Sequence, residues 1–522
     1  MSSKLLKSGM IVSFMTLISR VLGLLRDVVI ANLMGAGEAS DVFLFANKIP
    51  NFLRRLFVEG AFAQAFIPVL TQVKNEGDEQ HLREFIAKVS GSLGVVVTLV
   101  TVLGVIGSPI LAALFGAGWF VDYVTDQPGG AKFELASLML KITFPYLLFV
   151  SMAGLAGAIL NTLNKFAVAA FTPVLLNVAI IACAIYLAPE FEQPAFALAW
   201  GVFLGGFLQL LFLIPFLIKA KVMTMPKWGW ADPDVAKIRK LMIPALFGVS
   251  VGQINLLLDT MIASFLVTGS ISWLYYSDRL LEFPLGLFGI AIATVILPTL
   301  SRNHVSKDVK AFSANIDWAL RMVSVLGIPA AAGLIVLAEP MLLTIFQRGA
   351  FTSQDANFAS YSLMAYASGL WSFMLIKVLA PGFFSRQDMK TPVKYGIWCM
   401  AANMIFNLIF AYPFGYVGLA IATALSATMN AALLYYKLHQ TDVYKLSNLT
   451  LLLLVKIVIA TLFMVVTIIF FNPAIEQWVE LSLLHKSFEL SKLILLGGIV
   501  FLFSLLLFGV RPNNFHGASA IS

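Results

Sequence analysis

Long apolar runs dominate this sequence and constrain its fold more than any other feature. A helix needs about 20 apolar residues to cross a hydrocarbon core of about 30 Å. Fourteen windows of the sequence meet that requirement. Their approximate limits are 9–33, 41–70, 85–115, 134–160, 167–188, 194–218, 241–268, 272–300, 312–338, 357–384, 392–412, 415–438, 449–471 and 490–510. The sequence therefore predicts an all-α polytopic membrane protein with 14 transmembrane helices.

Composition supports the same class. Of 522 residues, 60% are hydrophobic and 12% are charged, whereas soluble proteins carry about 25% charged residues. The formal net charge of +8 does not indicate nucleic-acid binding here, because basic cytoplasmic loops of a membrane protein produce the same excess. The two cysteines, Cys183 and Cys399, lie in apolar runs and provide neither a disulfide framework nor a metal-ligand pattern.

The distribution of basic residues predicts the orientation. The loops after the even-numbered predicted helices hold 18 lysines and arginines, whereas the opposite loops hold four. Basic loops stay in the cytoplasm. Both termini are therefore predicted to be cytoplasmic, in agreement with an even number of helices.

A faint internal repeat predicts the domain organisation. Residues 47–72, "NKIPNFLRRLFVEGAFAQAFIPVLTQ", resemble residues 278–302, "DRLLEFPLGLFGIAIATVILPTLSR". Both copies follow a helix of the same direction, so the repeat is parallel, which places a central site between two halves. Two six-helix bundles are predicted at 1–220 and 221–440, with two further helices at 441–522. Chance recurrence of proline and glycine is the alternative.

Charges inside the second predicted helix share one face. The residues on that face are Asp41, Phe45, Lys48, Phe52, Arg55 and Glu59, at spacings of three and four, with Arg54 beside them. The first helix adds Arg20 and Arg26 against Asp27. Because charges at bilayer depth are costly, they indicate either a buried ion-pair network or the wall of a water-filled cavity. Five cations against three anions favour a cavity for an anionic ligand.

A second cluster lies in "YYSDRLLEFP". Arg279 and Glu282 are three residues apart, and Asp278 and Glu282 are four apart, so the three side chains share a helix face. Guanidinium groups bind phosphate or pyrophosphate in a bidentate manner. The candidate residues of the binding site are therefore these cations together with the acids that lie among them: Arg20, Arg26, Asp41, Lys48, Arg54, Arg55, Asp278, Arg279 and Glu282. Ion pairs that serve packing alone remain the alternative.

A third group of polar residues suits a small cation. Asp259 is an isolated carboxylate within an apolar helix, Asn403 and Asn407 lie one turn apart, and Thr423 lies on the next helix. Oxygen ligands of this kind bind hard cations such as Na⁺. Hydrogen-bonded asparagine packing is the alternative.

The motifs of the sequence predict how transport is powered. The sequence contains no phosphate-binding loop G-x-x-x-x-G-K-[ST], no H-E-x-x-H motif and no nucleophile elbow. A secondary transporter without a cofactor is therefore predicted in place of an enzyme or primary pump. The membrane potential supplies about 2.3 kcal/mol per charge per 100 mV, and a cation gradient is the second energy source considered.

Four segments, "SRVLGLLRD" (19–27), "NKIPNFLRRLFVEGAFAQAFIPVL" (47–70), "DRLLEFPLG" (278–286) and "APGFFSRQDMKTPVK" (380–394), resemble the MurJ/MviN family. These are bacterial lipid II flippases of the multidrug/oligosaccharidyl-lipid/polysaccharide exporter superfamily. The resemblance covers nearly the whole chain in order. It implies a multi-pass protein of the bacterial inner membrane, in which two bundles form a V around a cationic cavity and the last two helices form a lipid-accessible groove.

The resemblance also implies residue roles. Lipid II, the undecaprenyl-pyrophosphoryl disaccharide pentapeptide, is the implied substrate and moves to the periplasmic leaflet. Essential cavity arginines match Arg20, Arg26, Arg54 and Arg279, polar cavity positions match Asp41 and Lys48, and acids match Asp278 and Glu282. The family's sodium site matches Asp259, Asn403, Asn407 and Thr423, with Leu419 as a backbone ligand. Asn407 stands where the family also uses an aspartate, so one ligand charge is absent.

Partners and competing functions follow from these expectations. Lipid II, membrane lipids and a peptidoglycan-synthesis complex are the partners considered. A multidrug exporter of the same superfamily is the alternative function, although its cationic substrates suit an apolar or acidic cavity better than a basic one. A membrane polymerase of lipid-linked sugars needs a catalytic carboxylate outside the membrane, for which only Asp122 and Asp126 are candidates.

Overall fold

The protein folds into helices joined by short connections. A computed structural model describes residues 3–56 and 62–511. Within these ranges no β-strand forms, and the extended pairing is limited to an isolated bridge between Arg348 and Phe351. The predicted all-α class is confirmed.

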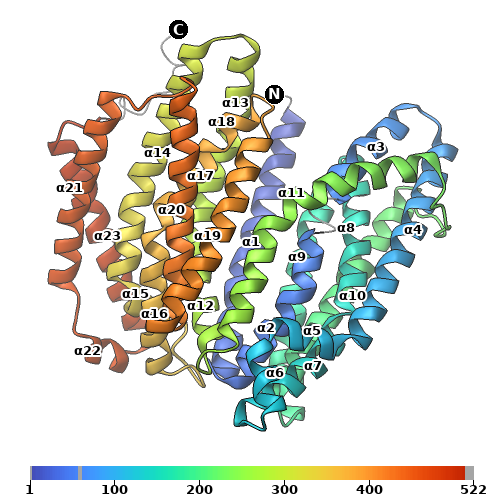
Figure 1. The fold of residues 1–522 in the computed structure, drawn as a ribbon, viewed down its shortest axis with the longest axis horizontal. Helices are drawn as coiled ribbons and strands as arrows, with labels where there is room; N and C mark the ends of the chain where they lie inside the picture. The colour runs from blue at the N-terminus through green and yellow to red at the C-terminus, as the bar shows by residue number, and fades with distance from the viewer. Residues whose placement is uncertain (1–2, 57–61, 512–522) are drawn as a thin grey trace. The chain divides into compact units, whose positions relative to one another are not determined.

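The chain divides into two compact units, Met1–Ser272 and Trp273–Ser522. The helices of the first unit are α1 (Ser3–Met34), α2 (Glu38–Arg54), α3 (Ala63–Asn75), α4 (Glu79–Ile106), α5 (Ser108–Phe115), α6 (Ala117–Val124), η2 (Pro128–Gly130), α7 (Ala131–Thr143), α8 (Tyr146–Thr162), α9 (Phe166–Ala182), η3 (Cys183–Leu187), η4 (Ala188–Glu190), α10 (Pro194–Lys219) and α11 (Pro233–Ala263). In this unit α9 packs against α1 and α10 (Figure 1). Helix α12 (Ser270–Pro284) begins in the first unit and continues in the second.

The second unit holds the remaining helices. These are η5 (Leu285–Gly289), α13 (Ile290–Val305), α14 (Val309–Val336), α15 (Ala338–Ile345), α16 (Ser353–Ser368), α17 (Leu370–Leu379), α18 (Pro381–Phe384), α19 (Lys390–Phe414), α20 (Tyr416–Gln440), α21 (Asn448–Phe471), α22 (Ile475–Glu480) and α23 (Leu483–Leu507). Helix α21 lies beside α23 and also packs against α14 (Figure 1).

Most predicted spans coincide with long apolar helices. By length and composition, 11 helical stretches of the described residues can cross a membrane, and each overlaps one predicted span. The other three predictions, 9–33, 41–70 and 241–268, overlap α1, the pair α2 and α3, and α11. Residues 57–61 of the second prediction lie outside the described ranges. A polytopic helical membrane protein is thus confirmed, and the count of 14 spans stays a prediction.

Both proposed repeat segments interrupt regular α-helix. Pro284 has no N–H to close an α-helical hydrogen bond, and the π-helix η5 follows it directly. In the first segment, Arg55 and Leu56 are also π-helical. This local likeness agrees with a repeat, but the repeat and the limits 1–220, 221–440 and 441–522 stay predictions.

Each unit has its own buried core, in which aliphatic side chains are mixed with aromatic ones. Phe66 stacks on Phe62 and Phe85 with ring centroids 5.1 and 6.0 Å apart, which ties α3 to α4. In the second unit Ile316 and Leu438 belong to one cluster of buried residues. Large apolar side chains on α21 and α23 stay exposed. Exposure on this scale marks a surface for an apolar partner, and for apolar helices that partner is lipid.

Candidate substrate-binding site

Two neighbouring side chains hold Arg26 in place. Its Nε and Nη2 donate to Asp27 Oδ1 at 3.0 and 2.6 Å, and its Nη1 donates to Asn177 Oδ1 at 3.1 Å. Asn177 Nδ2 donates to Ser19 O at 3.1 Å, which links α9 to α1. Asp27 is fully buried, so these charge-assisted bonds lie in surroundings of low polarity, where they are strong. Arg26 therefore stabilises the packing of α1, whatever else it binds.

Arg20 and Arg55 differ from Arg26 in their surroundings. Both side chains are exposed. Neither makes an ion pair or a hydrogen bond with the residues that the structure describes. An anionic ligand can approach these two guanidinium groups without displacing a partner among the described residues.

The other charges of α2 make polar contacts within the first unit. Lys48 Nζ donates to Thr260 Oγ1 of α11 at 3.1 Å. Arg54 Nε donates to Asn51 Oδ1 at 3.2 Å. Phe45 of the predicted face is buried against Trp119, with ring centroids 5.1 Å apart, and Glu59 lies outside the described residues. The shared polar face stays a prediction.

Asp41 caps another helix. Its Oδ1 accepts hydrogen bonds from the backbone N–H of Ser272 at 2.9 Å and from Ser272 Oγ at 2.6 Å, and its Oδ2 accepts from the Gly269 N–H at 2.6 Å. Asp41 is 2% exposed. Negative charge is favourable at a helix N-terminus, where backbone N–H groups lack helical partners. Its predicted role as a substrate contact stays untested, and the capping role is an addition that the sequence did not indicate.

The predicted cluster in α12 forms an ion pair. Arg279 Nη1 lies 3.1 Å from Glu282 Oε2, and the two side chains are 25% and 50% exposed. Asp278 is exposed on the same helix. The expected contact between residues three apart is confirmed, but an exposed pair of this kind adds little to stability.

The predicted cation ligands lie in both units. In the first, Asn255 Nδ2 donates to Asp259 Oδ2 at 3.4 Å. In the second, Asn407 Nδ2 donates to Asn403 Oδ1 at 3.0 Å, and Thr423 Oγ1 donates to the Leu419 carbonyl oxygen at 3.0 Å. Both asparagines are buried. Asn403 Oδ1 and the Leu419 carbonyl already accept hydrogen bonds, so a cation would share these oxygens.

No cluster of three or more acidic, histidine or cysteine side chains that would suit a metal ion occurs among the described residues. The predicted Na⁺ site at Asp259, Asn403, Asn407 and Thr423 would contain a single carboxylate. The lack of a cluster of three such side chains therefore does not test the predicted Na⁺ site. The hydrogen bond between Asn407 and Asn403, by contrast, is the asparagine packing that was the alternative to a cation site.

Several charged residues in the membrane helices were not predicted to be functional from the sequence. Asp317 and Arg321 of α14 form an ion pair of 2.8 Å, and Lys456 of α21 donates to the Phe508 carbonyl oxygen at 2.7 Å. Each lies inside a predicted span, and the i,i+4 spacing of the first two is typical of a helical pair. The signal was therefore present in the sequence.

Comparison with known proteins decides the family. A profile of the family described as "Lipid II flippase MurJ" matches residues 30–489. The chain belongs to this family. It is 61% identical to a "Probable lipid II flippase MurJ" of Vibrio cholerae over 518 residues, which cover 99% of each chain. It is 59% identical to the protein of the same description from Haemophilus influenzae, covering 96% of this chain and 99% of the relative. The resemblance stated from the sequence is confirmed.

Solved structures agree with this family assignment. The chain is similar to "Lipid II flippase MurJ, inward closed conformation" with a TM-score of 0.80 and 27% identity, over 96% of this chain and 98% of the other. An inward-facing multidrug transporter of the MATE family gives a TM-score of 0.66 at 13% identity, over 83% and 98% of the two chains. The second likeness shows a shared fold alone. Family membership makes this MurJ homologue a transporter and not an enzyme, and it does not favour the multidrug alternative.

Proposed function

We propose that this MurJ homologue carries lipid II from the cytoplasmic to the periplasmic leaflet of the bacterial inner membrane by alternating access. The observation that carries the proposal is the near-full-length identity of about 60% to relatives described as lipid II flippases. The membrane topology that we propose has 14 spans with both termini cytoplasmic, arranged as two six-helix bundles and a C-terminal pair of helices.

Basic side chains within the apolar helices bind the pyrophosphate in this proposal. Arg20 and Arg55 provide the first contacts, because both are exposed and carry no ion pair among the described residues. Arg279 contributes by exchanging Glu282, to which it is paired at 3.1 Å, for a phosphate oxygen. Lys48 and Arg54 contribute charge from α2. Arg26 acts chiefly through its contacts with Asp27 and Asn177.

The acidic residues have a separate role. Asp278 and Glu282 lie next to Arg279 on α12. They balance the charge of Arg279 when no phosphate is bound, and they repel the phosphate after release because like charges repel each other. Asp41 stabilises the start of α12 through Ser272 and Gly269. The polyprenyl tail remains in lipid along α21 and α23.

The proposal is tested by flipping of lipid II in proteoliposomes. Leaflet accessibility is measured with the membrane potential and a Na⁺ gradient varied separately. We expect flipping to require the wild-type protein and to stop when the potential is dissipated. A protein that is folded and correctly inserted but flips no lipid II under any gradient contradicts the proposal. A requirement for Na⁺ at constant potential identifies the cation gradient as the second driving force.

A further inference from the structure

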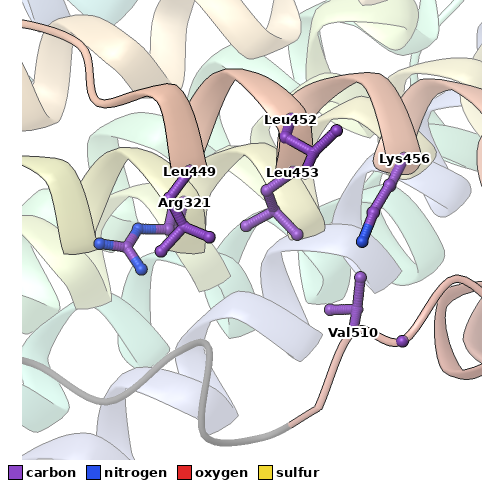
Figure 2. A pocket seen from close by; sticks show the side chains of 7 residues that line it. Arg321, Leu449, Leu452, Leu453, Lys456 and Val510 are labelled. Atoms are coloured by element: carbon purple, nitrogen blue, oxygen red, sulfur yellow. The ribbon is translucent and has the colours of Figure 1, made fainter.

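A pocket lies at one end of the second unit, between α14, the first turns of α21 and the turn that follows α23. We call it the α14–α21 pocket. Figure 2 shows its lining residues, which are Arg321, Leu449, Leu452, Leu453, Lys456, Gly509 and Val510. None of them belongs to the candidate substrate-binding site. The pocket therefore represents a separate feature of the fold.

The pocket combines apolar walls with two cations. Leu449 and Leu452 are 52% and 54% exposed, so they face the lipid that surrounds a membrane helix. Leu453 is buried at 5% exposure and forms the floor. Arg321 and Lys456 bring positive charge to the same pocket. A ligand that fits these walls has an anionic group joined to a hydrocarbon chain.

Neighbouring contacts fix the position of both cations. Arg321 Nη2 lies 2.8 Å from Asp317 Oδ2. Asp317 also accepts hydrogen bonds from the hydroxyls of Tyr444, Ser447 and Thr450 at 2.7, 2.9 and 2.7 Å, which spread its negative charge over four partners. The Lys456 ammonium donates to the Phe508 carbonyl oxygen at 2.7 Å. An ammonium has three N–H donors, so this one bond leaves others for a ligand.

Charge complementarity points to an anion. Lys456 donates to a carbonyl oxygen, which is neutral, so this contact does not balance its positive charge, and Arg511 follows the lining residue Val510 directly. Cations at bilayer depth are costly unless they reach a charged partner or the interface. A lipid phosphate at the membrane surface is such a partner.

We propose that the α14–α21 pocket binds an anionic glycerophospholipid, with its phosphate on Arg321 and Lys456 and an acyl chain along Leu449 and Leu452. The lipid is a resident ligand and not the transported substrate. Because the lining comes from α14, α21 and the turn after α23, a bound lipid joins the C-terminal helix pair to the rest of the second unit. The site thus stabilises the helices along which the polyprenyl tail is proposed to lie.

The test is a lipid titration of the purified full-length protein by native mass spectrometry. Phosphatidylglycerol is compared with zwitterionic phosphatidylcholine. We expect preferential binding of phosphatidylglycerol, and we expect Lys456→Gln to weaken it about five-fold, the effect of one basic residue near an anionic lipid. Lys456→Arg is expected to retain binding. Lys492→Gln is the matched control, since Lys492 also lies on the C-terminal helix pair, pairs with Glu489 and does not line the pocket.

Each alternative outcome overturns the inference. Equal binding of the two lipids shows a nonspecific apolar surface. Equal effects of Lys456→Gln and Lys492→Gln show general electrostatic attraction. Lys456→Gln that weakens an undecaprenyl pyrophosphate probe as strongly as phosphatidylglycerol assigns the pocket to the substrate. The result is independent of the proposed transport function, because Arg20→Ala is expected to abolish flipping and to leave phosphatidylglycerol binding unchanged.

Discussion

The carboxylate of Asp41 accepts two hydrogen bonds from Ser272, from the backbone N–H at 2.9 Å and from Oγ at 2.6 Å. The two residues are 231 positions apart in the sequence. Through this contact the first turn of α2 caps the N-terminus of α12 in the interior of the first unit. The same helix carries Arg279 three turns or fewer further on, so the cap positions a helix that bears a candidate substrate ligand.

Replacing Asp41 by alanine tests the cap. Asp41→Ala leaves the buried N–H groups of Gly269 and Ser272 without their acceptor, which costs about 1–3 kcal/mol for each group. We expect Asp41→Ala to lower the free energy of unfolding and the melting temperature markedly. We expect Ser272→Ala to lower the free energy of unfolding by less, about 1 kcal/mol. Ser270→Ala is the control, because Ser270 Oγ bonds to Val267 O and not to Asp41. Melting of the purified protein in detergent measures all three. Equal stability of Asp41→Ala and Ser270→Ala contradicts the capping role.

Arg20 and Arg26 provide a second test, since they lie on one helix in different surroundings. Arg26→Ala removes the ion-pair partner that lies 2.6 Å from the fully buried Asp27, and loss of one member of a buried pair costs roughly 3 kcal/mol. Arg20→Ala removes an exposed group. We expect both variants to abolish flipping, but only Arg26→Ala to lower the melting temperature. Flipping assays and melting curves on the same preparations separate the two effects. If the Arg20→Ala variant flips lipid II normally, Arg20 does not make the proposed contact with the pyrophosphate.

These contacts show what a sequence can and cannot predict here. The helices are predictable because apolar runs of membrane length have one stable backbone conformation in lipid. The Arg279–Glu282 pair is predictable because i,i+3 neighbours meet on one helix. The Asp41–Ser272 and Arg26–Asn177 contacts are not, because they join segments far apart in the chain and neither serine nor asparagine is distinctive within an apolar run.

A charged network elsewhere was predictable in part. Asp317 and Arg321 are four residues apart inside one predicted span, which is sufficient to expect an ion pair. The hydroxyls of Tyr444, Ser447 and Thr450 come from the α20–α21 connection and the start of α21, and no spacing in the sequence relates them to α14. Local pairs follow from helical geometry, whereas this long-range docking depends on packing that only the folded unit supplies.

The Asp317 network provides a third prediction. Tyr444→Phe removes one hydrogen bond to a buried carboxylate, which costs about 1.5–3 kcal/mol, and it keeps the aromatic ring. We expect faster hydrogen exchange over the α20–α21 connection and the first turn of α21. Tyr435→Phe is the control, because Tyr435 belongs to the same neighbourhood but donates no hydrogen bond to Asp317. Identical exchange in the two variants contradicts a docking role for the network.

A fourth prediction concerns pH. Asp388, which precedes α19 and lies outside the predicted spans, accepts hydrogen bonds from the Thr391 backbone N–H at 3.0 Å and from Thr391 Oγ1 at 2.7 Å. Burial alone would raise the pKa of Asp388. The hydrogen bonds from Thr391 and the positive charge of Arg386 together outweigh burial, so the pKa lies below its usual value. A carboxyl with a depressed folded pKa contributes stability above its unfolded pKa, about 3.9, and loses it as the pH falls through the folded value.

We therefore expect the start of α19 to keep its protection from hydrogen exchange down to about pH 4 and to lose it below. Asp388→Ala removes the acceptor at every pH and opens the same turn at pH 7, at a cost of about 1 kcal/mol. Exchange rates corrected for their intrinsic pH dependence provide the measurement. Loss of protection already near pH 6 in the unmodified protein excludes Asp388 as the responsible group.

The last prediction tests the proposed cation ligands. Asn407 donates to Asn403 at 3.0 Å within a buried pair, and an asparagine supplies no charge to balance a cation. Asn407→Asp adds a hard anionic oxygen of the kind that binds small cations. We expect this variant to be less stable than the unmodified protein in KCl, because an unpaired buried carboxylate is costly, and to regain stability in NaCl. Melting temperatures in the two salts measure the difference. Asn407→Leu, which removes the polar group, is expected to show no difference between the salts. If Asn407→Asp also melts at the same temperature in both, the two asparagines serve packing and the site does not bind Na⁺.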